Sequence, residues 1–543
     1  MRGLFAIVLI SITILIIGVY SDKTELIPKL GGQYQEGILG QPRFINPVLS
    51  QTNDTDRDLV QIIYSSLFKY DGQGNLIPDL VEEYNIEEDN VTYNISLRKD
   101  VLWHDGELLT ANDVMFTIKT IQDPEYKSPL RNIWQSVQIE KVDEFTIKFK
   151  LNNVYVSFLH NLTVNIMPRH LWAGISAANF PLAQYNLKPI GSGPYKFNEF
   201  HKNEKGKVES MEFLRNEKYY SSEKPYINKV IIRFYNSQDE LIQAYQKRQI
   251  EGLSFLSPIK QEGLRNNLNI HEINLPIYYS IFFNQTKSKA LADKNVRLAL
   301  SYATNKEEIV EKVLKGKGDI VDSPLLKDWP NYSSDTKIYE FALEHAQNLL
   351  ESNGWKDTDE DGIRQKIIND EDTNLEFDLV ASDWPEFKQT AEILKEQWEK
   401  LGLKVNLKII NATDVQQEYL RPRNYQALLF GEVLSADPDP FAFWHSTQKK
   451  DPGLNIAFYD NKDADKLLQD ARQTINPEER TEKYAEFQKI LIDDAPAVFL
   501  YSPIYLYPVN KNIKGIEIEK LAQPSYRFSQ IEDWYIKTKR VWR

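Results

Sequence analysis

The sequence predicts a mixed α/β protein with at least two lobes, and three observations lead to this prediction. Short runs that alternate apolar and polar residues, typical of half-buried strands, dominate residues 33–154. From about Asp293 onward, helical and strand-like patterns alternate along the chain, as in α/β proteins. Between these regions, residues 189–194 form a stiff Gly/Pro turn that we interpret as a lobe boundary.

The N-terminal region combines strands with a capped helix. Residues 91–97 and 145–151 alternate like half-buried strands, and Asp71-Gly72 is typical of a hairpin turn. Residues 110–113 read Thr-Ala-Asn-Asp, a variant of the capping box that satisfies the free N–H groups at a helix start. We therefore expect a helix to begin at this point.

The C-terminal region carries clearer helix boundaries. Residues 304–307 form another capping box, and residues 385–400 have helical periodicity followed by Leu401-Gly402, a left-handed stop. Residues 403–409 then alternate as a strand. Asn476-Pro477 places Asn at a helix cap and Pro in the first turn, so a late helix is expected there.

Composition and charge exclude several classes of protein. The net charge is −13, from 65 basic and 78 acidic residues spread along the chain, which argues against nucleic acid as a partner. The chain has no cysteine, so disulfides, thiol catalysis, cysteine-ligated zinc and a lipidated N-terminal cysteine are all excluded.

The N-terminus predicts an extracytoplasmic protein. Arg2 precedes an apolar run over residues 4–20, whose length lies between that of a signal peptide and that of a membrane span. The positive charge keeps the N-terminus in the cytoplasm, so the body lies outside. Residues 19–21 are a poor signal peptidase site, and we therefore favour an uncleaved membrane anchor over residues 1–21 above a cleaved signal peptide.

Six sequence motifs match one known family in the family's own order. The stretch over residues 97–114 is the most specific, because it follows the pattern L-R-x-x-V-x-F-H-D-G-x-x-x-T-A-x-D-V. From residue 33 to the end, the chain resembles the family 5 extracellular solute-binding proteins, the dipeptide- and oligopeptide-binding proteins of ABC transporters. The motifs are residues 63–71 (IYSSLFKYD), 78–83 (PDLVEE), 97–114 (LRKDVLWHDGELLTANDV), 191–196 (GSGPYK), 283–284 (FN) and 296–303 (VRLALSYA).

The resemblance implies a class II periplasmic-binding-protein-like fold, with two lobes that close on a cleft and one extra domain. Lobe I would comprise residues 30–52, 187–280 and 504–543, the extra domain residues 53–186, and lobe II residues 281–503. It also implies a monomer that captures peptides outside the membrane and delivers them to the permease subunits of the transporter.

The resemblance also implies a ligand site around Asp437, the residue expected to hold the α-amino group of a peptide. The local pattern is one residue shorter than the family's A-D-Y-P-D-P, so Asp439 is the alternative, and an exposed Asp-Pro turn is a further reading. Removing one partner of a buried ion pair costs about 3–5 kcal/mol, so Asp437→Ala should weaken amine-terminated ligands several hundredfold or more. Other expected contacts, each with core packing or plain strand structure as an equal alternative, are Gly431, Leu434, Ser435, Trp444, Tyr278, Glu36 and Ile38.

An acidic loop raises the question of a structural metal. Asp357, Asp359 and Asp361 alternate before Gly362, as at the start of a calcium loop. The twelfth position holds Ile368 where a calcium loop has Glu, so a solvated acidic turn is the other interpretation. Function requires no cofactor, and a bound calcium would be structural.

Three other functions remain open. The same fold binds oligosaccharides, nickel complexes or haem in this family, so the fold does not determine the solute. A membrane-tethered ligand sensor is a second alternative. A carboxylate-dependent hydrolase is a third, although H-E-x-x-H and G-x-S-x-G are absent and the seven His residues have no metal-ligand spacing.

Overall fold

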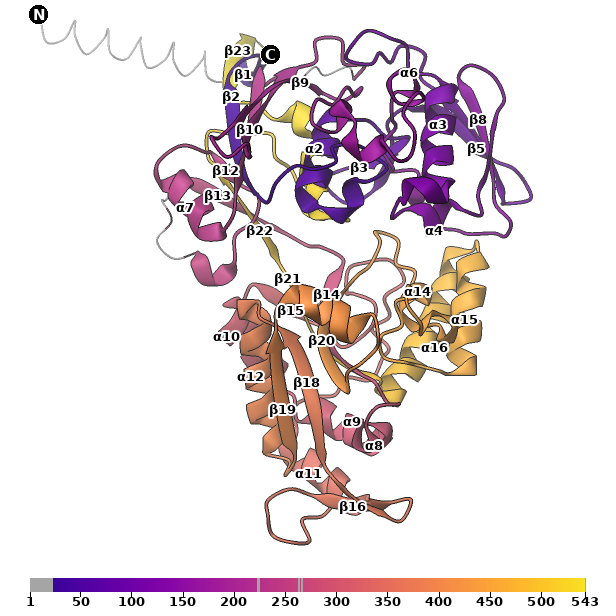
Figure 1. The fold of residues 1–543 in the computed structure, drawn as a ribbon, viewed down its shortest axis with the longest axis vertical. Coiled ribbons are helices and arrows are strands. Elements are labelled where there is room, and N and C mark those ends of the chain that lie inside the picture. The colour runs from indigo at the N-terminus through magenta and orange to yellow at the C-terminus, as the bar shows by residue number, and fades with distance from the viewer. Residues whose placement is uncertain (1–22, 222–224, 262–263, 265–266, 543) are drawn as a thin grey trace, which may run out of the picture.

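The computed structural model describes residues 23–542 except 222–224, 262–263 and 265–266. The predicted anchor over residues 1–21 lies outside the described residues. Within the part of the chain that the structure describes, no helix is long and apolar enough to cross a membrane. The described chain forms an upper and a lower lobe built on separate sheets, which confirms the predicted mixed α/β class (Figure 1).

The upper lobe is organised around a seven-stranded sheet of order β13-β22-β12-β2-β11-β10-β9. The central strand β2 runs parallel to β11 and β12, whereas β9, β10 and β11 form an antiparallel meander. Helix α7 (Gln238–Gln246) packs beside β2 and β12. The strands are β2 (Gln33–Leu39), β9 (Tyr195–Lys202), β10 (Val208–Arg215), β11 (Lys229–Tyr235), β12 (Gly252–Leu253), β13 (Leu268–Ile273) and β22 (Tyr505–Asn510).

Residues between β2 and β9 form a second part of the upper lobe around a four-stranded sheet, β5-β6-β8-β7. Helix α3 begins where the sequence predicts, because Thr110 and Asp113 form the capping box. This part shares one apolar core with the seven-stranded sheet. Its elements are α2 (Asp54–Ile63), β3 (Phe68–Tyr70), β4 (Leu76–Pro78), β5 (Val81–Ile86), β6 (Thr92–Leu97), α3 (Ala111–Gln122), α4 (Arg131–Trp134), β7 (Gln138–Lys141), β8 (Thr146–Lys150), α5 (Phe158–Asn161) and α6 (Arg169–Trp172).

The Gly/Pro turn lies within the upper lobe, next to the expected boundary between the extra domain and lobe I at residues 186 and 187, and that boundary stays a prediction. Gly193 N donates to Ile63 O at 2.8 Å, and a Cβ on Gly191 would lie 2.0 Å from the same oxygen. Only glycine permits this close approach of backbone to backbone. The turn therefore fastens the end of α2 to the start of β9 and joins two parts of one lobe.

The lower lobe contains a six-stranded sheet of order β15-β21-β14-β20-β18-β19, with an apolar core on each face. The predicted helix at 385–400 and strand at 403–409 correspond to α12 and β19. The elements are β14 (Ile277–Phe283), α8 (Lys289–Ala292), α9 (Lys294–Tyr302), α10 (Lys306–Leu314), β15 (Gly318–Ile320), α11 (Leu343–Ser352), β16 (Gln365–Ile368), β17 (Glu371–Asn374), β18 (Glu376–Ser382), α12 (Pro385–Glu399), β19 (Lys404–Ile410), α13 (Ala412–Asp414), the π-helical turn η6 (Val415–Leu420), β20 (Ala427–Val433), α14 (Phe441–Trp444), α15 (Lys462–Gln473), α16 (Pro477–Asp494) and β21 (Ala497–Pro503).

The start of α10 differs from its prediction by one residue. Asn305, not Thr304, is the N-cap, and its side chain accepts from Glu308 N at 2.9 Å. Thr304 is buried and donates its hydroxyl to Leu300 O of the preceding helix at 2.7 Å. Its side chain is therefore already engaged, which leaves the cap to the next residue.

The described chain passes between the lobes twice. Residues 274–276 lead from β13 to β14, and Ile504 alone separates β21 from β22. β14 pairs with β20 and β21 in the lower sheet, so the first crossing precedes the expected boundary at residues 280 and 281. The second crossing lies at residue 504, where lobe I is expected to resume. The division into three domains itself stays a prediction.

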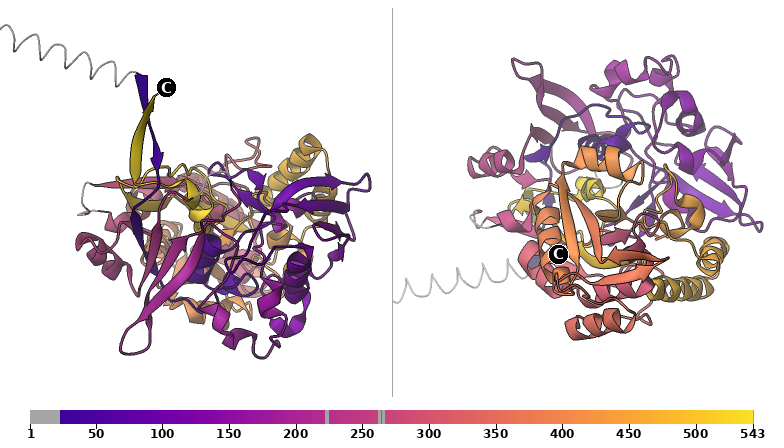
Figure 2. Two further views of the ribbon diagram at one scale, coloured as in Figure 1. Left: turned by 90° about the horizontal axis from the view of Figure 1, so that it is seen from above. Right: turned by 60° about the horizontal axis from the view of Figure 1, so that its bottom comes forward.

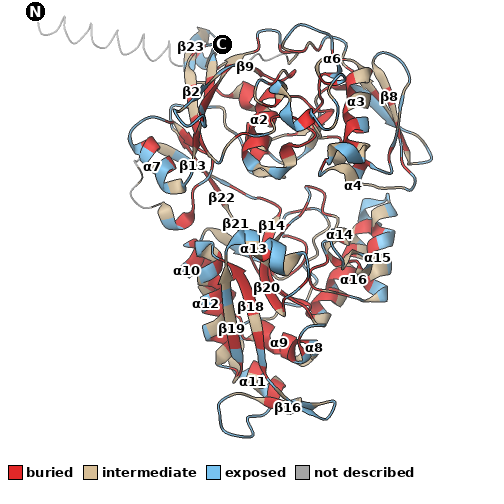
Figure 3. Cartoon of the chain, viewed as in Figure 1, coloured by how far each residue is buried: buried red, intermediate tan, exposed pale blue. Residues whose placement is uncertain are grey.

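Both described ends of the chain meet in a ribbon on the upper lobe. Strands β1 (Thr24–Lys29) and β23 (Lys537–Trp542) pair in antiparallel fashion, and the ribbon projects from the body (Figure 2). Buried residues concentrate along the sheets and the inner helix faces of both lobes, and the ribbon is largely exposed (Figure 3).

Candidate ligand-binding site

A cavity of about 500 Å³ lies between the two lobes, next to both crossing segments. This volume is within the range of small-molecule sites. Its walls carry six aromatic side chains drawn from both lobes, namely Phe255, Tyr279, Trp384, Phe387, Tyr501 and Tyr505. Trp384 is 54% exposed, which is unusual for so large an apolar side chain. The cavity can therefore surround a ligand with aromatic faces and their polar tips.

The lobes touch at the edge of this cavity. Ser257 of the upper lobe donates to Glu386 of the lower lobe at 2.6 Å, and Glu386 also lines the cavity. Because only two short segments join the lobes, such a contact can form or break with little change inside either lobe.

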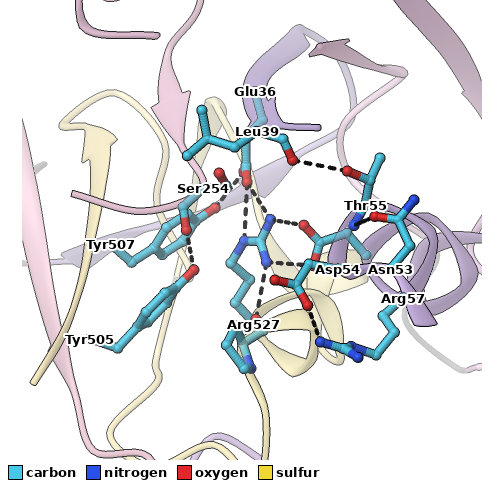
Figure 4. Close-up of polar contacts among 12 residues, drawn as sticks. Glu36, Leu39, Asn53, Asp54, Thr55, Arg57, Ser254, Tyr505, Tyr507 and Arg527 are labelled. Carbon is cyan, nitrogen blue, oxygen red and sulfur yellow. Dashed lines mark hydrogen bonds and ion pairs between the residues drawn. The ribbon is translucent and has the colours of Figure 1, made fainter. Parts of the chain in front are cut away.

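A buried ion cluster forms the upper wall (Figure 4). Arg527 bonds Glu36 Oε1 through Nε and Nη2 at 3.0 and 2.8 Å, and bonds both oxygens of Asp58 at 2.7 and 2.6 Å. Burial lowers the pKa of Arg527, but attraction to Asp58 and Glu36 outweighs it and holds that pKa well above its usual value. Burial raises the pKa of Asp58. The cluster ties β2, α2 and the C-terminal segment into one rigid wall.

Arg57 and Asp54 form a more accessible ion pair on the same wall. The Asp54 side chain is 83% exposed and the Arg57 side chain 24% exposed. These two charges, with Glu386 opposite, are the charged groups of the cavity that retain contact with solvent and can rearrange around a ligand.

The structure separates the residues that the sequence proposes as ligand contacts. Ile38 lines the cavity, but Glu36 is fully buried against Arg527. Tyr278 and Trp444 are also fully buried, in the core on one face of the lower sheet, so the expectation that they line the cleft does not hold in this conformation. Tyr278 lies on β14 and Trp444 on α14, and both side chains pack inside this core.

Residues 431–437 lie together at the end of β20 and in the loop that follows. Gly431 lines a second, smaller cavity, Leu434 is buried and Ser435 is exposed. Ser435 Oγ donates to the main-chain oxygen of Asp437. Val433 is exposed and pairs with Ile277 across the sheet. The ligand-binding role of these residues stays a prediction.

Asp437 already has a cationic partner. Arg480 Nη2 lies 3.0 and 2.9 Å from its two carboxylate oxygens, and Ser157 Oγ donates to Oδ2 at 2.6 Å. Ser157 belongs to the upper lobe, so this group also joins the lobes. A ligand amine would have to share this carboxylate with Arg480. The charge of Asp437 alone is therefore a weaker indication of an amine site than the sequence implies.

Asp439 has a comparable environment. Its carboxylate pairs with Arg472 Nε at 2.8 Å, and burial raises its pKa. Neither Asp437 nor Asp439 lines the cavity of about 500 Å³ in this conformation. Asp437 as the partner of a ligand amine, with Asp439 as its alternative, stays a prediction.

The acidic loop lies at the far end of the lower lobe, just before β16. Carboxylate atoms of Asp357, Asp359 and Asp361 come within 4.8 Å of one another, and all three residues are exposed. Gly362 N and Gln365 Nε2 already donate to Asp357 and Asp359, at 3.0 and 2.7 Å. Calcium binding here stays a prediction, and calorimetric titration of wild type against Asp359→Asn with Ca²⁺ tests it.

Three features of the site were missed from the sequence. Arg527 shows no local pattern that marks a buried cation, because its partners are 491 and 469 residues away in the chain. Trp384 precedes a helix-initiating proline, a position that gives no sign of a cavity wall. The pairing of Ser257 with Glu386 depends on how the lobes meet.

Two lobes that enclose an aromatic cavity at a double crossing define a solute-binding protein. The family model for bacterial extracellular solute-binding proteins, family 5, matches residues 75–455. The chain therefore belongs to this family, which confirms the resemblance found in the sequence and the periplasmic-binding-protein-like fold.

Similar proteins cover almost the entire chain. The oligopeptide-binding protein AppA of Bacillus subtilis is 29% identical over 519 residues, which cover 94% of this chain and 92% of the relative. The structure of AppA in complex with a nonapeptide aligns with a TM-score of 0.75 at 28% identity, covering 94% of this chain and 100% of that one. NikZ from Campylobacter jejuni, in complex with Ni(L-His), aligns with a TM-score of 0.77 at 28% identity, covering 93% and 99%.

Proposed function

We propose that this protein is the substrate-binding component of an ABC transporter, which captures peptides outside the membrane and delivers them to the permease. The observation that carries this proposal is the aromatic cavity between lobes joined by two short segments, in a chain of this family. The relatives named for oligopeptides and the neighbour with a bound nonapeptide support peptide as the solute.

Binding would proceed by closure of the lobes around the ligand. Closure removes water from the peptide, so each of its backbone N–H and C=O groups needs a protein partner. Strand pairing along residues 433–435 would supply such partners without regard to side-chain identity. The aromatic walls, Trp384 above all, would cover the apolar parts of the side chains.

The peptide amine also needs a carboxylate, and the structure offers two kinds. Asp437, with Asp439 as its alternative, is the group that the family resemblance implies, but Arg480 already neutralises Asp437. Glu386 lines the cavity and is bound only by Ser257 among the described residues. Comparing Asp437→Asn with Glu386→Gln, on free and N-acetylated forms of one peptide, identifies the group that recognises the amine.

Binding of defined ligands tests the function. We expect peptides of two to nine residues to stabilise the purified protein, by about 2.7 kcal/mol at 100 times the dissociation constant. Oligosaccharides, Ni²⁺ with histidine, and haem are the competing ligands. If no peptide protects the protein and one of these does, the peptide proposal fails. Recovery of the intact peptide by mass spectrometry separates binding from the hydrolase alternative, and uptake assays in cells separate transport from sensing.

Trp384→Ala tests whether the cavity between the lobes binds the peptide, and Trp542→Ala is its matched control. Both side chains are exposed, at 54% and 68%, but only Trp384 lines the cavity. Loss of a large aromatic contact at a binding site costs about 2 kcal/mol or more, so Trp384→Ala should weaken peptide binding at least tenfold. Trp542→Ala should bind as the wild type does. Equal affinities in both variants would rule out this cavity as the binding site.

The family is extracellular, and we propose in addition that residues 1–21 tether the protein to the membrane. The support is the single positive charge followed by the apolar run. Mass spectrometry of the membrane fraction should recover a peptide that contains residues 1–21. A mature protein that begins after residue 21 in the soluble fraction would refute the tether. We expect a monomer by light scattering.

A further inference from the structure

The lower lobe contains a second cavity, of about 290 Å³, which shares no lining residue with the first. It is enclosed by the turn after η6, the end of β20 and the loop 451–456. Gly431 lines it, and the residue that pairs with Gly431 across the sheet, Tyr279, lines the cavity between the lobes. Helix α13, which leads into η6, lies at the end of the lower lobe that faces the upper lobe (Figure 3).

Glu432 is the unusual residue of this cavity. Its side chain is 3% exposed, and Oε2 accepts a hydrogen bond from the Tyr278 hydroxyl. Oε1 is buried and has no hydrogen-bond partner within the described part of the chain. Burial raises the pKa of Glu432 to about 8. A buried polar atom without a partner costs about 1–3 kcal/mol, so its presence calls for an explanation.

The buried cation of the same cavity does not neutralise Glu432. Arg423 donates its guanidinium N–H groups to the main-chain oxygens of Leu420, Lys449 and Gly453, and so holds the loop together. The remaining charged groups of the cavity, Arg421 and Asp451, are exposed at its rim. Among the described residues, none therefore serves as a counter-ion for the carboxyl group of Glu432.

We propose that this cavity is a subsite of the ligand cleft and takes a cationic side chain, lysine or arginine, with Glu432 as its counter-ion. The inference rests on the proposed function of peptide capture. A cation next to Oε1 supplies the missing partner and makes the ionised form of Glu432 favourable. Phe430 and Phe443, both half-buried, line the cavity and suit the aliphatic part and the charge of such a side chain.

The subsite implies that ligand binding releases a proton. Because burial raises the pKa of Glu432 to about 8, this carboxyl group is mainly protonated at pH values below 8. When a lysine ammonium group binds, the carboxyl group gives its proton to the buffer and the ion pair forms. Tyr278 from β14 donates to Glu432, and the other ionisable groups that line the cavity are Arg421 and Arg423 from the turn after η6 and Asp451 from the neighbouring loop. The affinity for cationic side chains should therefore rise between pH 6 and pH 8, while that for neutral side chains should not.

Calorimetry on the full chain tests the proposal. Tripeptides that differ only by lysine or norleucine at each position are titrated into wild type, Glu432→Gln and Glu418→Gln. Glu418 is an exposed carboxylate on η6 and serves as the matched control. At one position, we expect lysine to bind about 10- to 100-fold more tightly than norleucine in the wild type and the control, from the strength of a charged hydrogen bond. Glu432→Gln should abolish this preference, whereas Glu418→Gln should retain it.

Calorimetric titrations in phosphate and in Tris buffer measure the number of protons released on binding, because the two buffers differ in their enthalpy of ionisation. Release of a proton with the lysine peptide, in the wild type but not in Glu432→Gln, supports the subsite. A lysine preference that persists in Glu432→Gln, or no preference in the wild type, overturns it. If no peptide binds at all, the proposed function fails. The subsite can then be tested separately with n-butylammonium, which carries the ammonium group of a lysine side chain. Thermal protection of the wild type but not of Glu432→Gln then supports the subsite, and equal protection overturns it.

Discussion

Replacing Arg527 with Met removes the cation that holds the upper wall of the cleft together. Met has a similar length and keeps the apolar contacts, but it leaves Glu36 and Asp58 buried without a counter-ion. Breaking a buried pair by removing one partner costs about 3–5 kcal/mol. Arg527 is 1% exposed and makes four bonds to the two carboxylates, so we expect the upper end of this range, about 5 kcal/mol.

The loss should depend on pH. Burial already raises the pKa of Asp58, and removal of the arginine raises it further. A carboxyl group whose pKa is higher in the folded than in the unfolded state destabilises the fold as pH rises between those two values. Arg527→Met should therefore be less destabilised at pH 5 than at pH 8, because protonation relieves the unpaired charges.

Urea unfolding followed by tryptophan fluorescence at pH 5 and pH 8 measures both effects. The control is Arg57→Met, since Arg57 pairs with the exposed Asp54 on the same helix and should lose less than about 1 kcal/mol. Adding Glu36→Gln and Asp58→Asn to Arg527→Met should recover much of the loss. A cost within 1 kcal/mol of the control, or one that does not change with pH, would refute the account of the cluster.

Three further changes follow from the structure. Gly191→Ala should destabilise the protein by about 1–3 kcal/mol or more in urea unfolding, because its Cβ would meet Ile63 O, while Gly174→Ala, with open space around it, should be tolerated. Because the raised pKa of Glu432 favours its neutral form in the folded state, the free energy of unfolding of the wild type should fall between pH 5 and pH 8, and Glu432→Gln should make this fall smaller. Parallel curves of unfolding free energy against pH for the two proteins would contradict this. Asp437→Asn should reduce the preference for a free over an acetylated peptide amine by about tenfold or more in calorimetry. An unchanged preference would show that another group recognises the amine.

The elements predicted correctly are those with local causes. The capping box at Thr110 and the stop at Leu401-Gly402 act within a few residues, and α3, α12 and β19 lie where these patterns place them. The cap at residue 304 was off by one because Thr304 is used by the preceding helix, a contact that propensity does not describe.

The site was harder to predict because its residues meet only after folding. Tyr278 and Trp444 have the composition of a cleft wall, but both are fully buried in the core on one face of the lower sheet. Asp437 was proposed from its Asp-Pro segment and the family resemblance, whereas Arg480, which lies 43 residues further along and pairs with it, carries no such pattern. The ion pair between the two residues could be seen only in the tertiary structure.

The ribbon of β1 and β23 determines how the protein can be held without disturbing its motion. Both described ends of the chain lie in the upper lobe, and the described chain connects the lower lobe covalently to the upper lobe at the two crossings. A surface, a tag or a membrane attached to either end therefore holds the upper lobe and leaves the lower lobe free to move relative to it. Protein immobilised through its C-terminus on a biosensor chip should close on its ligand as freely as protein in solution.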